Sequence, residues 1–269
     1  MGFIYKNNAL NQIIWINVFV FLILRLLIKI EYITPNDPIS GESFYFLASS
    51  TNIDMILKNP WTLLTQMFTH INPGHICANM FVLYVFGTIF LKYLNNKKII
   101  SVYLLGGICS FIFLIIFDDS KSWNYGASGA TYAIMFATTA FIPNYSFKIY
   151  NTNLLIKIKY FTILLIIVPI IIDPKNIQAH ITHLGGGSYG LLYIYLLKKP
   201  ENMLNKIAAF FSLIFSKKNT KKVVIENDYD YNARKKNEEK KLNQVLDKIS
   251  KSGYSSLSKK EKEILEKDN

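Results

Sequence analysis

Gly126-Ala127-Ser128-Gly129-Ala130 is a segment in which one serine stands between two glycines. It lies between a polar loop and the apolar run 130–142, which predicts a helix that begins at Ser128. The small neighbours permit a tight turn and let other backbone approach the serine hydroxyl. Unpaired N–H groups and the positive end of the helix dipole gather at a helix N-terminus. Such an environment suits a developing oxyanion.

The predicted helix is short for a membrane. Residues 128–142 give about 22 Å at ~1.5 Å per residue, whereas the hydrocarbon core of a bilayer is about 30 Å thick. Pro143-Asn144 ends the helix, so we expect Ser128 to lie within the bilayer plane. The alternative is that the glycines around Ser128 form only a small-residue contact between helices. The rest of the chain decides between the two interpretations.

The composition is that of a membrane protein. The chain has 269 residues, 51% of them hydrophobic, which is too apolar for an ordinary soluble domain. Six apolar runs approach the ~20 residues that a spanning helix needs. They are residues 12–30, 75–94, 99–117, 128–142, 154–172 and 180–197. The sequence therefore predicts an all-α polytopic membrane protein, with a six-transmembrane-helix bundle in residues 1–200 and a short helical cytoplasmic tail in residues 201–269.

The net charge of +12 does not indicate a nucleic-acid partner, because the lysines follow a membrane topology. The external loops carry most of the acidic residues of the predicted bundle. This positive-inside bias places both termini in the cytoplasm. Six spans without a transit peptide favour a bacterial plasma membrane. The internal loops hold Lys92, Lys97, Lys98, Lys148, Lys157 and Lys159.

The four histidines of the chain, His70, His75, His180 and His183, all lie near the outer ends of predicted spans. One interpretation is a metal site, since a His-x-x-His pair on a helix can chelate. No clustered Asp or Glu and no His-Glu-x-x-His motif accompanies them, so we expect neither a metal nor another cofactor. The other interpretation is that the histidines serve a serine nucleophile.

In this second interpretation, Ser128 and one of the histidines form a catalytic dyad. His183 shares a helix face with Gly186 and Gly190, and small residues there let this helix lie directly against a neighbour. His183 can then act as the base for Ser128. The spans offer no buried Asp as a third member, and the fifth run contains Pro169 but no candidate catalytic residue.

The second predicted span carries two further polar residues. His75 and Asn79 stand at positions i and i+4, so they share one helix face. Strongly polar residues within a span are costly and indicate function by default. Together with the backbone N–H of Ser128, they can form an oxyanion hole. Tyr132, at i+4 from Ser128, lies on the same face as the serine.

These residues resemble the rhomboid family of intramembrane serine proteases, over nearly all of residues 10–198. The nucleophile motif Gly-x-Ser-Gly of that family matches Gly126, Ser128 and Gly129. Its base motif, a histidine followed by glycines at +3 and +7, matches His183. His180 fails this register because residue 183 is not a glycine.

Two more rhomboid motifs are present wholly or in part. The second-span motif of two histidines and an asparagine matches His70, His75 and Asn79, and the resemblance puts a tyrosine beneath the catalytic imidazole at Tyr132. We expect His70 to hold the first loop, and His180 to lie at the cavity edge or the membrane interface. The Trp-Arg pair of the family is represented by Trp61, but Thr62 replaces the arginine, which affects how the first loop is anchored.

The resemblance implies a serine endopeptidase that cleaves transmembrane segments of membrane proteins, with the lipid bilayer and transmembrane substrates as partners. A rhomboid-like adaptor that binds transmembrane clients without cutting them is the alternative. Such relatives usually lack the serine or the histidine, and this chain has both. A small transporter is a third interpretation, but paired intramembrane carboxylates and an internal repeat are missing.

The tail contains separate helical patterns. Residues 202–215 are apolar but too short to span, which predicts an interfacial helix. Leu242, Val245, Leu246 and Ile249 mark one face of a charged helix, and residues 250–253 end it. A capping-box pattern at residues 258–261 begins a second short helix. These patterns predict a helical hairpin, with a solvated charged tail as the alternative. Residues 248–254 resemble an extension seen in some bacterial rhomboids.

Overall fold

The computed structural model describes residues 8–30, 46–120, 122–148, 155–199 and 228–258, together with residues 261, 262 and 265. The predicted interfacial helix at residues 202–215 lies outside these described residues.

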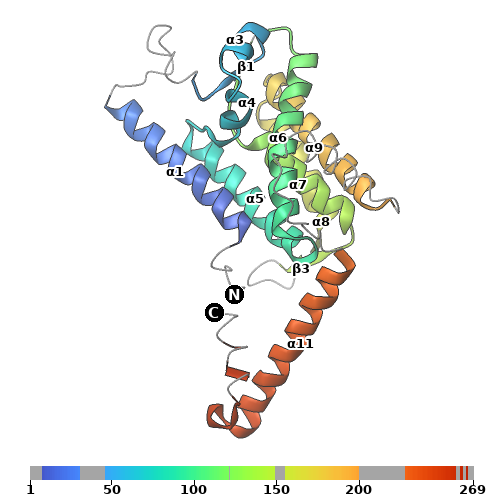
Figure 1. The fold of residues 1–269 in the computed structure, drawn as a ribbon. Coiled ribbons are helices and arrows are strands. Elements are labelled where there is room, and N and C mark those ends of the chain that lie inside the picture. The colour runs from blue at the N-terminus through green and yellow to red at the C-terminus, as the bar shows by residue number, and fades with distance from the viewer. Residues whose placement is uncertain are drawn as a thin grey trace, which may run out of the picture.

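Each of the six predicted spans contains a helix in the structure (Figure 1). Three of these helices, α1, α5 and α6, are long and apolar enough to cross a membrane, and α8 is a shorter apolar helix. The chain is thus a mostly helical membrane protein, whereas the count of six spans stays a prediction. The helices are α1 (Ala9–Lys29), α5 (Pro73–Tyr93), α6 (Asn96–Phe117), α7 (Ser128–Phe141), α8 (Ile158–Ile172) and α9 (Ile177–Leu197).

Helix α7 is the centre of the bundle. Nine of its 14 residues are buried, although few of them are large. It packs most extensively against α9, then against α6 and α5, which surround it in Figure 1. The short side chains Ala130, Ala133 and Ala137 are fully covered by these neighbours. Small residues let helix backbones come close together, so they favour a central position for this helix.

Large apolar side chains point outward from the bundle. On α1, Trp15 and Phe19 are exposed, and on α8, Ile163, Ile167 and Ile171 are exposed. Helix faces of this kind are unfavourable in water but match the apolar interior of a bilayer. The exposed side chains therefore support a membrane location independently of helix length.

Asparagines explain why several helices begin before the apolar runs do. Asn8, Asn72, Asn95 and Asn176 are the N-caps of α1, α5, α6 and α9, and each side chain accepts a hydrogen bond from a backbone N–H of the first turn. Asparagine is among the preferred N-cap residues because it satisfies one of these orphan donors. The polar caps and first turns lie outside the apolar runs, so the predicted bounds begin two or three residues late.

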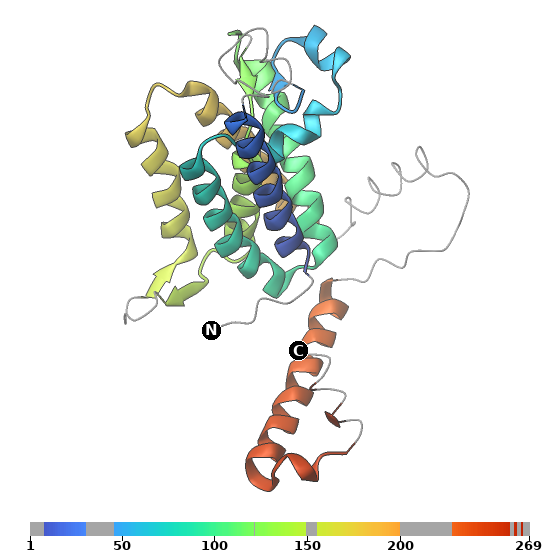
Figure 2. The same ribbon diagram turned by 90° about the vertical axis from the view of Figure 1, so that its left-hand side faces the viewer.

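Two short strand pairs depart from the all-α prediction. Strand β1 (Ser49–Ser50) pairs antiparallel with β2 (Trp123–Asn124) beside the start of α7. Strand β4 (Leu155–Lys157) pairs with β3 (Ser146–Lys148), so α8 begins later than the predicted residue 154. Figures 1 and 2 show the two pairs at opposite ends of the bundle.

Short helices cover the end at which α7 begins. They are α3 (Ile53–Lys58), α4 (Thr62–Thr65) and the 3₁₀ turn η1 (Gln66–Phe68). The end of the bundle that carries β3 and β4 is rich in lysine. There Lys92 donates a hydrogen bond to the Tyr145 hydroxyl (2.9 Å) and Lys198 donates one to the Ala140 carbonyl (3.1 Å). The positive-inside topology that the sequence predicts puts this end of the bundle in the cytoplasm, and it stays a prediction.

The tail contains a long helix followed by a tight turn. Helix α11 (Asp228–Ser252) ends before Gly253, whose φ of 76° and ψ of 164° form an extended backbone conformation that essentially only glycine adopts. The 3₁₀ turn η2 (Tyr254–Ser256) packs back against α11. Of the predicted apolar face, Val245 is buried, but Leu246 is 47% exposed and points away.

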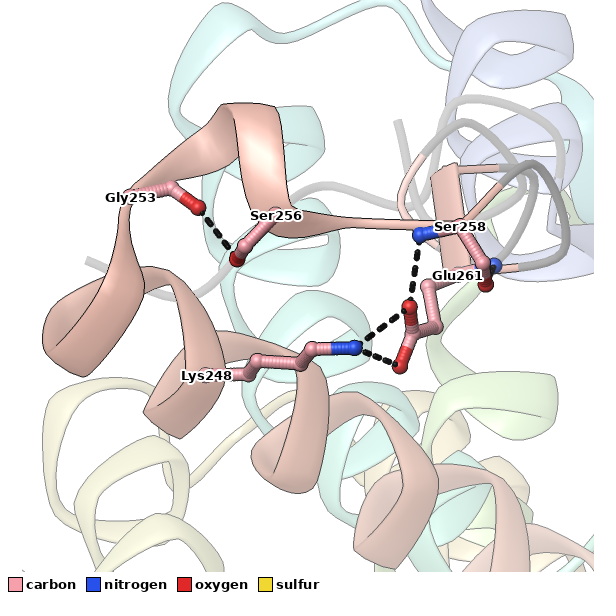
Figure 3. A network of polar contacts seen from close by, with 5 residues as sticks. All are labelled: Lys248, Gly253, Ser256, Ser258 and Glu261. Carbon is pink, nitrogen blue, oxygen red and sulfur yellow. Dashed lines mark hydrogen bonds and ion pairs between the residues drawn. The ribbon is translucent and has the colours of Figure 1, made fainter.

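The predicted capping box follows this turn (Figure 3). The Ser258 N–H donates to a Glu261 carboxylate oxygen at 2.7 Å, and the Glu261 N–H donates to the Ser258 hydroxyl at 3.4 Å. Lys248 of α11 reaches across and donates to both Glu261 oxygens at 2.9 and 3.0 Å. The carboxylate of Glu261 therefore links α11 to the segment that follows η2, whereas the complete hairpin stays a prediction.

This carboxylate should make the contact between α11 and residues 258–261 sensitive to acid. The Lys248 ammonium, followed by the groups of Ser258, lowers the pKa of Glu261 from 4.5 to about 2. Because the pKa is lower in the folded state than in the unfolded state, this carboxylate stabilises the folded state at pH values above 4.5. The stabilisation is lost as the pH falls from 4.5 towards 2. Hydrogen exchange of the backbone amides of residues 245–262 in the full chain, corrected for intrinsic pH dependence, should show protection falling in that range.

Two substitutions test the assignment to Glu261. The Glu261→Gln variant should lose part of this protection already at neutral pH, and the loss should be modest because exposed ion pairs contribute little. Asp247→Asn, a matched change on the exposed surface of α11, should exchange like wild type. Equal protection in Glu261→Gln and wild type would contradict the prediction.

Candidate active site

Ser128 is the first residue of α7, as the sequence predicts, and its side chain is half-buried. Gly126, two residues earlier, has a φ of 119°, a backbone conformation that side chains disfavour. A β-carbon at Gly126 would also lie 2.7 Å from Cε1 of His75. Residue 126 must therefore be glycine for two reasons, and the imidazole of His75 lies directly against the turn that presents Ser128.

His183 lies against α7 through Tyr132. The two rings are stacked, with centroids 3.9 Å apart and planes 10° from parallel. The Tyr132 hydroxyl donates a hydrogen bond to the Leu165 carbonyl of α8 at 2.8 Å. His180 is placed differently, because its Nε2 lies 3.0 Å from the Asp173 carbonyl in the turn between α8 and α9.

The backbones of α7 and α9 touch beside Ser128 and His183. A β-carbon at Gly186 would lie 2.1 Å from the Gly129 carbonyl oxygen, and one at Gly190 would lie 2.3 Å from the Ala133 carbonyl oxygen. These two contacts, one turn apart on each helix, show that the helices run parallel here. Ser128 directly precedes Gly129, and His183 lies one turn before Gly186. Both Ser128 and His183 therefore lie beside the close contact between Gly129 and Gly186.

The serine and the histidine are brought to one junction without a hydrogen bond between them. In the described part of the chain, no such bond joins the Ser128 side chain to His183. Catalytic hydrogen bonds are often long in an unliganded site and shorten when substrate binds. The arrangement is thus compatible with a dyad.

His70 connects the first loop to the segment that carries Ser128. Its Nε2 lies 3.1 Å from the Ala127 N–H and 3.1 Å from Nδ2 of Asn79. Both neighbours are donors, so Nε2 is the acceptor and the proton of the neutral imidazole is assigned to Nδ1. The rings of His70 and His75 meet edge to face at 5.3 Å. His70 therefore fixes the residue that precedes Ser128.

Asn79 is buried between α5 and α7. Besides its bond to His70, its Oδ1 lies 3.4 Å from the Thr131 hydroxyl, which itself lies 2.9 Å from the Ser128 carbonyl. An amide nitrogen carries two hydrogens. The bond to His70 therefore leaves one Asn79 hydrogen that can be directed at another acceptor.

Gln66 holds the same segment from the other side, and the sequence interpretation missed it. Its backbone carbonyl accepts the Gly126 N–H at 2.8 Å, and its Oε1 accepts Nδ2 of Asn124 at 2.6 Å. The side chain is 1% exposed. A lone glutamine four residues before His70 does not differ in sequence from an ordinary polar residue, so no signal pointed to it.

The first loop is anchored despite the missing arginine. Trp61 donates from Nε1 to the Phe46 carbonyl at 2.8 Å and packs on the Phe46 ring. The hydroxyl of Thr62, a buried residue, lies 3.2 Å from the Ser49 hydroxyl and donates to the Asn59 carbonyl at 2.7 Å. These contacts hold the described part of the first loop with a threonine at position 62.

The metal interpretation gains nothing from the structure. Across the described ranges, no group of three His, Cys, Asp or Glu side chains is close enough to hold a metal ion. His70 and His75 instead contact Ala127, Asn79 and Gly126, which all belong to the surroundings of Ser128.

Comparison with known families decides the membership of this chain. The Rhomboid domain family matches residues 57–200, which is more than half of the sequence. The chain belongs to the rhomboid family. This rhomboid's tail, residues 226–267, matches a second family, DUF6576, described as a family of unknown function.

Several rhomboid-like proteins are similar to this rhomboid. "Presenilin-associated rhomboid-like protein, mitochondrial" of Bos taurus is 30% identical over 202 residues, covering 70% of the chain and 48% of the relative. Its counterpart from Rattus norvegicus is 28% identical over 159 residues, covering 54% and 40%. "RHOMBOID-like protein 12, mitochondrial" of Arabidopsis thaliana is 34% identical over 91 residues, covering 28% and 27%. The chain spans about half the length or less of these relatives.

The names of these relatives bear on the expected location. All three are named as mitochondrial proteins. They support a membrane protein, but they do not support the bacterial plasma membrane that the sequence interpretation favoured.

Proposed function

We propose that this rhomboid is an intramembrane serine endopeptidase in which Ser128 is the nucleophile and His183 the base. The observation that carries the proposal is the position of His183, stacked on Tyr132 at the junction where Gly186 meets Gly129. A helix N-terminus, a histidine base and small residues that bring them together are the elements of an activated serine. Membership of the rhomboid family supports it, since that family includes intramembrane serine proteases.

In the proposed reaction, His183 removes the proton from the Ser128 hydroxyl as its oxygen attacks the carbonyl carbon of the scissile peptide bond. The tetrahedral intermediate collapses when His183 donates this proton to the leaving amine nitrogen. Water, deprotonated by His183, then hydrolyses the acyl-enzyme and restores the free serine. No cofactor takes part in these steps.

The developing oxyanion needs donors close to Ser128. We propose the Ser128 N–H, the His75 imidazole and the second amide hydrogen of Asn79. The contact between His75 and Gly126 supports this assignment, as does the burial of Asn79 beside α7. Donors that are already fixed by the fold stabilise charge without reorganising at the moment of reaction.

The substrates proposed are transmembrane segments of other membrane proteins. A transmembrane helix hides its peptide bonds, so a cleavable segment must unwind locally, and we expect weak helix formers and a small residue before the cut. The six helices are proposed to span the bilayer with both ends of the bundle on the lysine-rich side. The names of the relatives make a mitochondrial membrane the first location to test.

A fluorophosphonate probe tests the proposal directly, because it forms a covalent bond only with an activated serine. Detergent-purified wild-type protein should be labelled, and mass spectrometry of the digested protein should locate the probe on Ser128. Heat-unfolded protein provides the control for non-specific labelling. A folded wild-type protein that remains unlabelled would contradict the proposal and favour the alternative of a rhomboid-like adaptor that binds transmembrane clients without cutting them.

Asn79→Ala tests the oxyanion hole. Loss of one oxyanion donor typically lowers turnover by roughly a hundredfold or more. We therefore expect kcat for a transmembrane model substrate to fall by about that factor with KM little changed. The nearby Thr131→Ser variant retains the hydroxyl beside Asn79 and should keep near wild-type turnover. A change of KM alone in Asn79→Ala would count against the assignment.

A further inference from the structure

Helix α8 contains a proline at a position where its effect can be followed atom by atom. Pro169 lies inside this helix of residues Ile158–Ile172. Proline has no N–H, so the carbonyl four residues earlier, that of Leu165, loses its usual helical partner. In this structure the Tyr132 hydroxyl donates to that carbonyl at 2.8 Å.

The tyrosine that bonds this carbonyl is also the one beneath His183. Its ring stacks on the imidazole at 3.9 Å, while its hydroxyl is held by α8. Tyr132 is 7% exposed, and a buried hydroxyl requires a hydrogen-bond partner. A regular helix would offer only carbonyls that already accept a bond from their own chain.

We propose that Pro169 is a positioning residue for His183, because it frees the Leu165 carbonyl that holds Tyr132 beneath the imidazole. The function of His183 as base rests on the proposed protease activity, whereas the chain of contacts from Pro169 to the imidazole does not. Pro169 itself touches neither substrate nor the reacting atoms in this proposal. It acts by fixing one end of the tyrosine, and the tyrosine fixes the plane of the histidine.

A second polar contact also orients the face of α8 that carries Leu165 towards α7. The hydroxyls of Thr139 and Thr162 lie 2.6 Å apart, and Thr162 is one turn before Leu165. Much of the remaining surface of α8 is exposed, and Figure 2 shows this yellow helix at the edge of the bundle. Apolar packing of Phe161 against Phe86 also attaches α8 to the bundle, and the bond from Tyr132 adds a directed polar contact at Leu165.

The simpler explanation is that Pro169 only kinks or weakens α8. The two explanations differ in what happens when the hydroxyl is absent. If Pro169 acts through Tyr132, then Pro169→Ala should have no further effect in a Tyr132→Phe protein. If it acts through helix shape alone, its effect should persist in that background. A double-mutant cycle separates these cases.

The experiment compares wild type, Tyr132→Phe, Pro169→Ala and the double variant, with Tyr160→Phe as the control. Tyr160 is on α8 too, but its ring is 58% exposed. The first measurement is the rate of fluorophosphonate labelling of Ser128, since a small probe does not depend on entry of a transmembrane helix. We expect each single variant to be slower by roughly threefold to tenfold, the effect of one net hydrogen bond. The double variant should be no slower than Tyr132→Phe.

The second measurement does not depend on catalysis. In protein labelled with ¹³C-histidine, the Hε1 signal of His183 should be displaced by the ring current of the stacked tyrosine, and His183→Asn identifies it by deletion. Tyr132→Phe and Pro169→Ala should both move this signal, with His70, His75 and His180 as internal references. Tyr160→Phe should leave it in place.

Each outcome bears on the proposal. Signal movement in both single variants, with no added change in the double variant, supports it even if wild type is not labelled, in which case the protease function alone fails. A labelled wild type whose His183 signal is unchanged by Pro169→Ala overturns the positioning role while the protease function stands. Additive effects of the two substitutions, on the signal or on labelling, also overturn it.

Discussion

Ser128→Ala and His183→Ala are each expected to abolish cleavage of a transmembrane model substrate, whereas His180→Ala should retain most of the activity. Removal of a nucleophile or of its base lowers turnover by roughly a thousandfold or more. The two histidines differ in their contacts, because His183 stacks on Tyr132 while His180 bonds the Asp173 carbonyl at the edge of α9.

His180→Ala is a matched control for His183→Ala, since it removes the same side chain one turn earlier on the same helix. Cleavage in proteoliposomes, followed by gel electrophoresis, gives the rates. Thermal unfolding and gel filtration of each variant show whether the bundle is intact. An inactive but folded His180→Ala beside an active His183→Ala would mean that the base is assigned to the wrong turn of α9.

Much of the bundle could be predicted because its signals are local. Apolar runs located all six helices, and the proline and asparagine that follow the run at residues 130–142 placed the end of α7 within one residue. The spacing of His183, Gly186 and Gly190 identified the face that meets α7, since i, i+3 and i+7 repeat on a helix whatever its surroundings. The contacts of Gly186 and Gly190 with α7 backbone show why that face carries no larger side chain.

The details that were missed depend on partners far apart in the sequence. Strands β1 and β2 have two residues each, and their paired residues are 73 and 75 positions apart in the sequence, so no period of hydrophobicity could reveal them. Gln66 acts largely through its backbone carbonyl, which every residue has. Pro169 was recognised as an interruption of the fifth apolar run, but the carbonyl that it frees has meaning only once Tyr132 is known to face it.

Gly186→Ala is expected to destabilise the bundle and to reduce activity severely. The new methyl group would lie 2.1 Å from the Gly129 carbonyl oxygen, well inside the contact distance of carbon and oxygen. Backbone cannot rotate out of the way as a side chain can, so α7 and α9 have to separate. Overpacking of this kind typically costs about 1–3 kcal/mol, and more where nothing yields.

The displacement matters for chemistry because it falls between Ser128 and His183. A shift of about 1 Å between reacting groups can lower a rate roughly a hundredfold. The expected result is therefore a loss of labelling and cleavage that exceeds the loss of stability, measured on protein that is still folded at low temperature.

Gly187→Ala provides the comparison, since it adds the same methyl group to the next residue of α9. The three atoms nearest to that methyl group all belong to the ring of Phe136, the closest at 3.0 Å, and a side chain can move by a few tenths of an ångström. We expect a small decrease in thermal stability and near wild-type labelling. Equal behaviour of the two variants would contradict the prediction, because it would mean that close backbone contact between α7 and α9 does not align the serine with the histidine. The alignment would then have to come from Tyr132 and α8 alone.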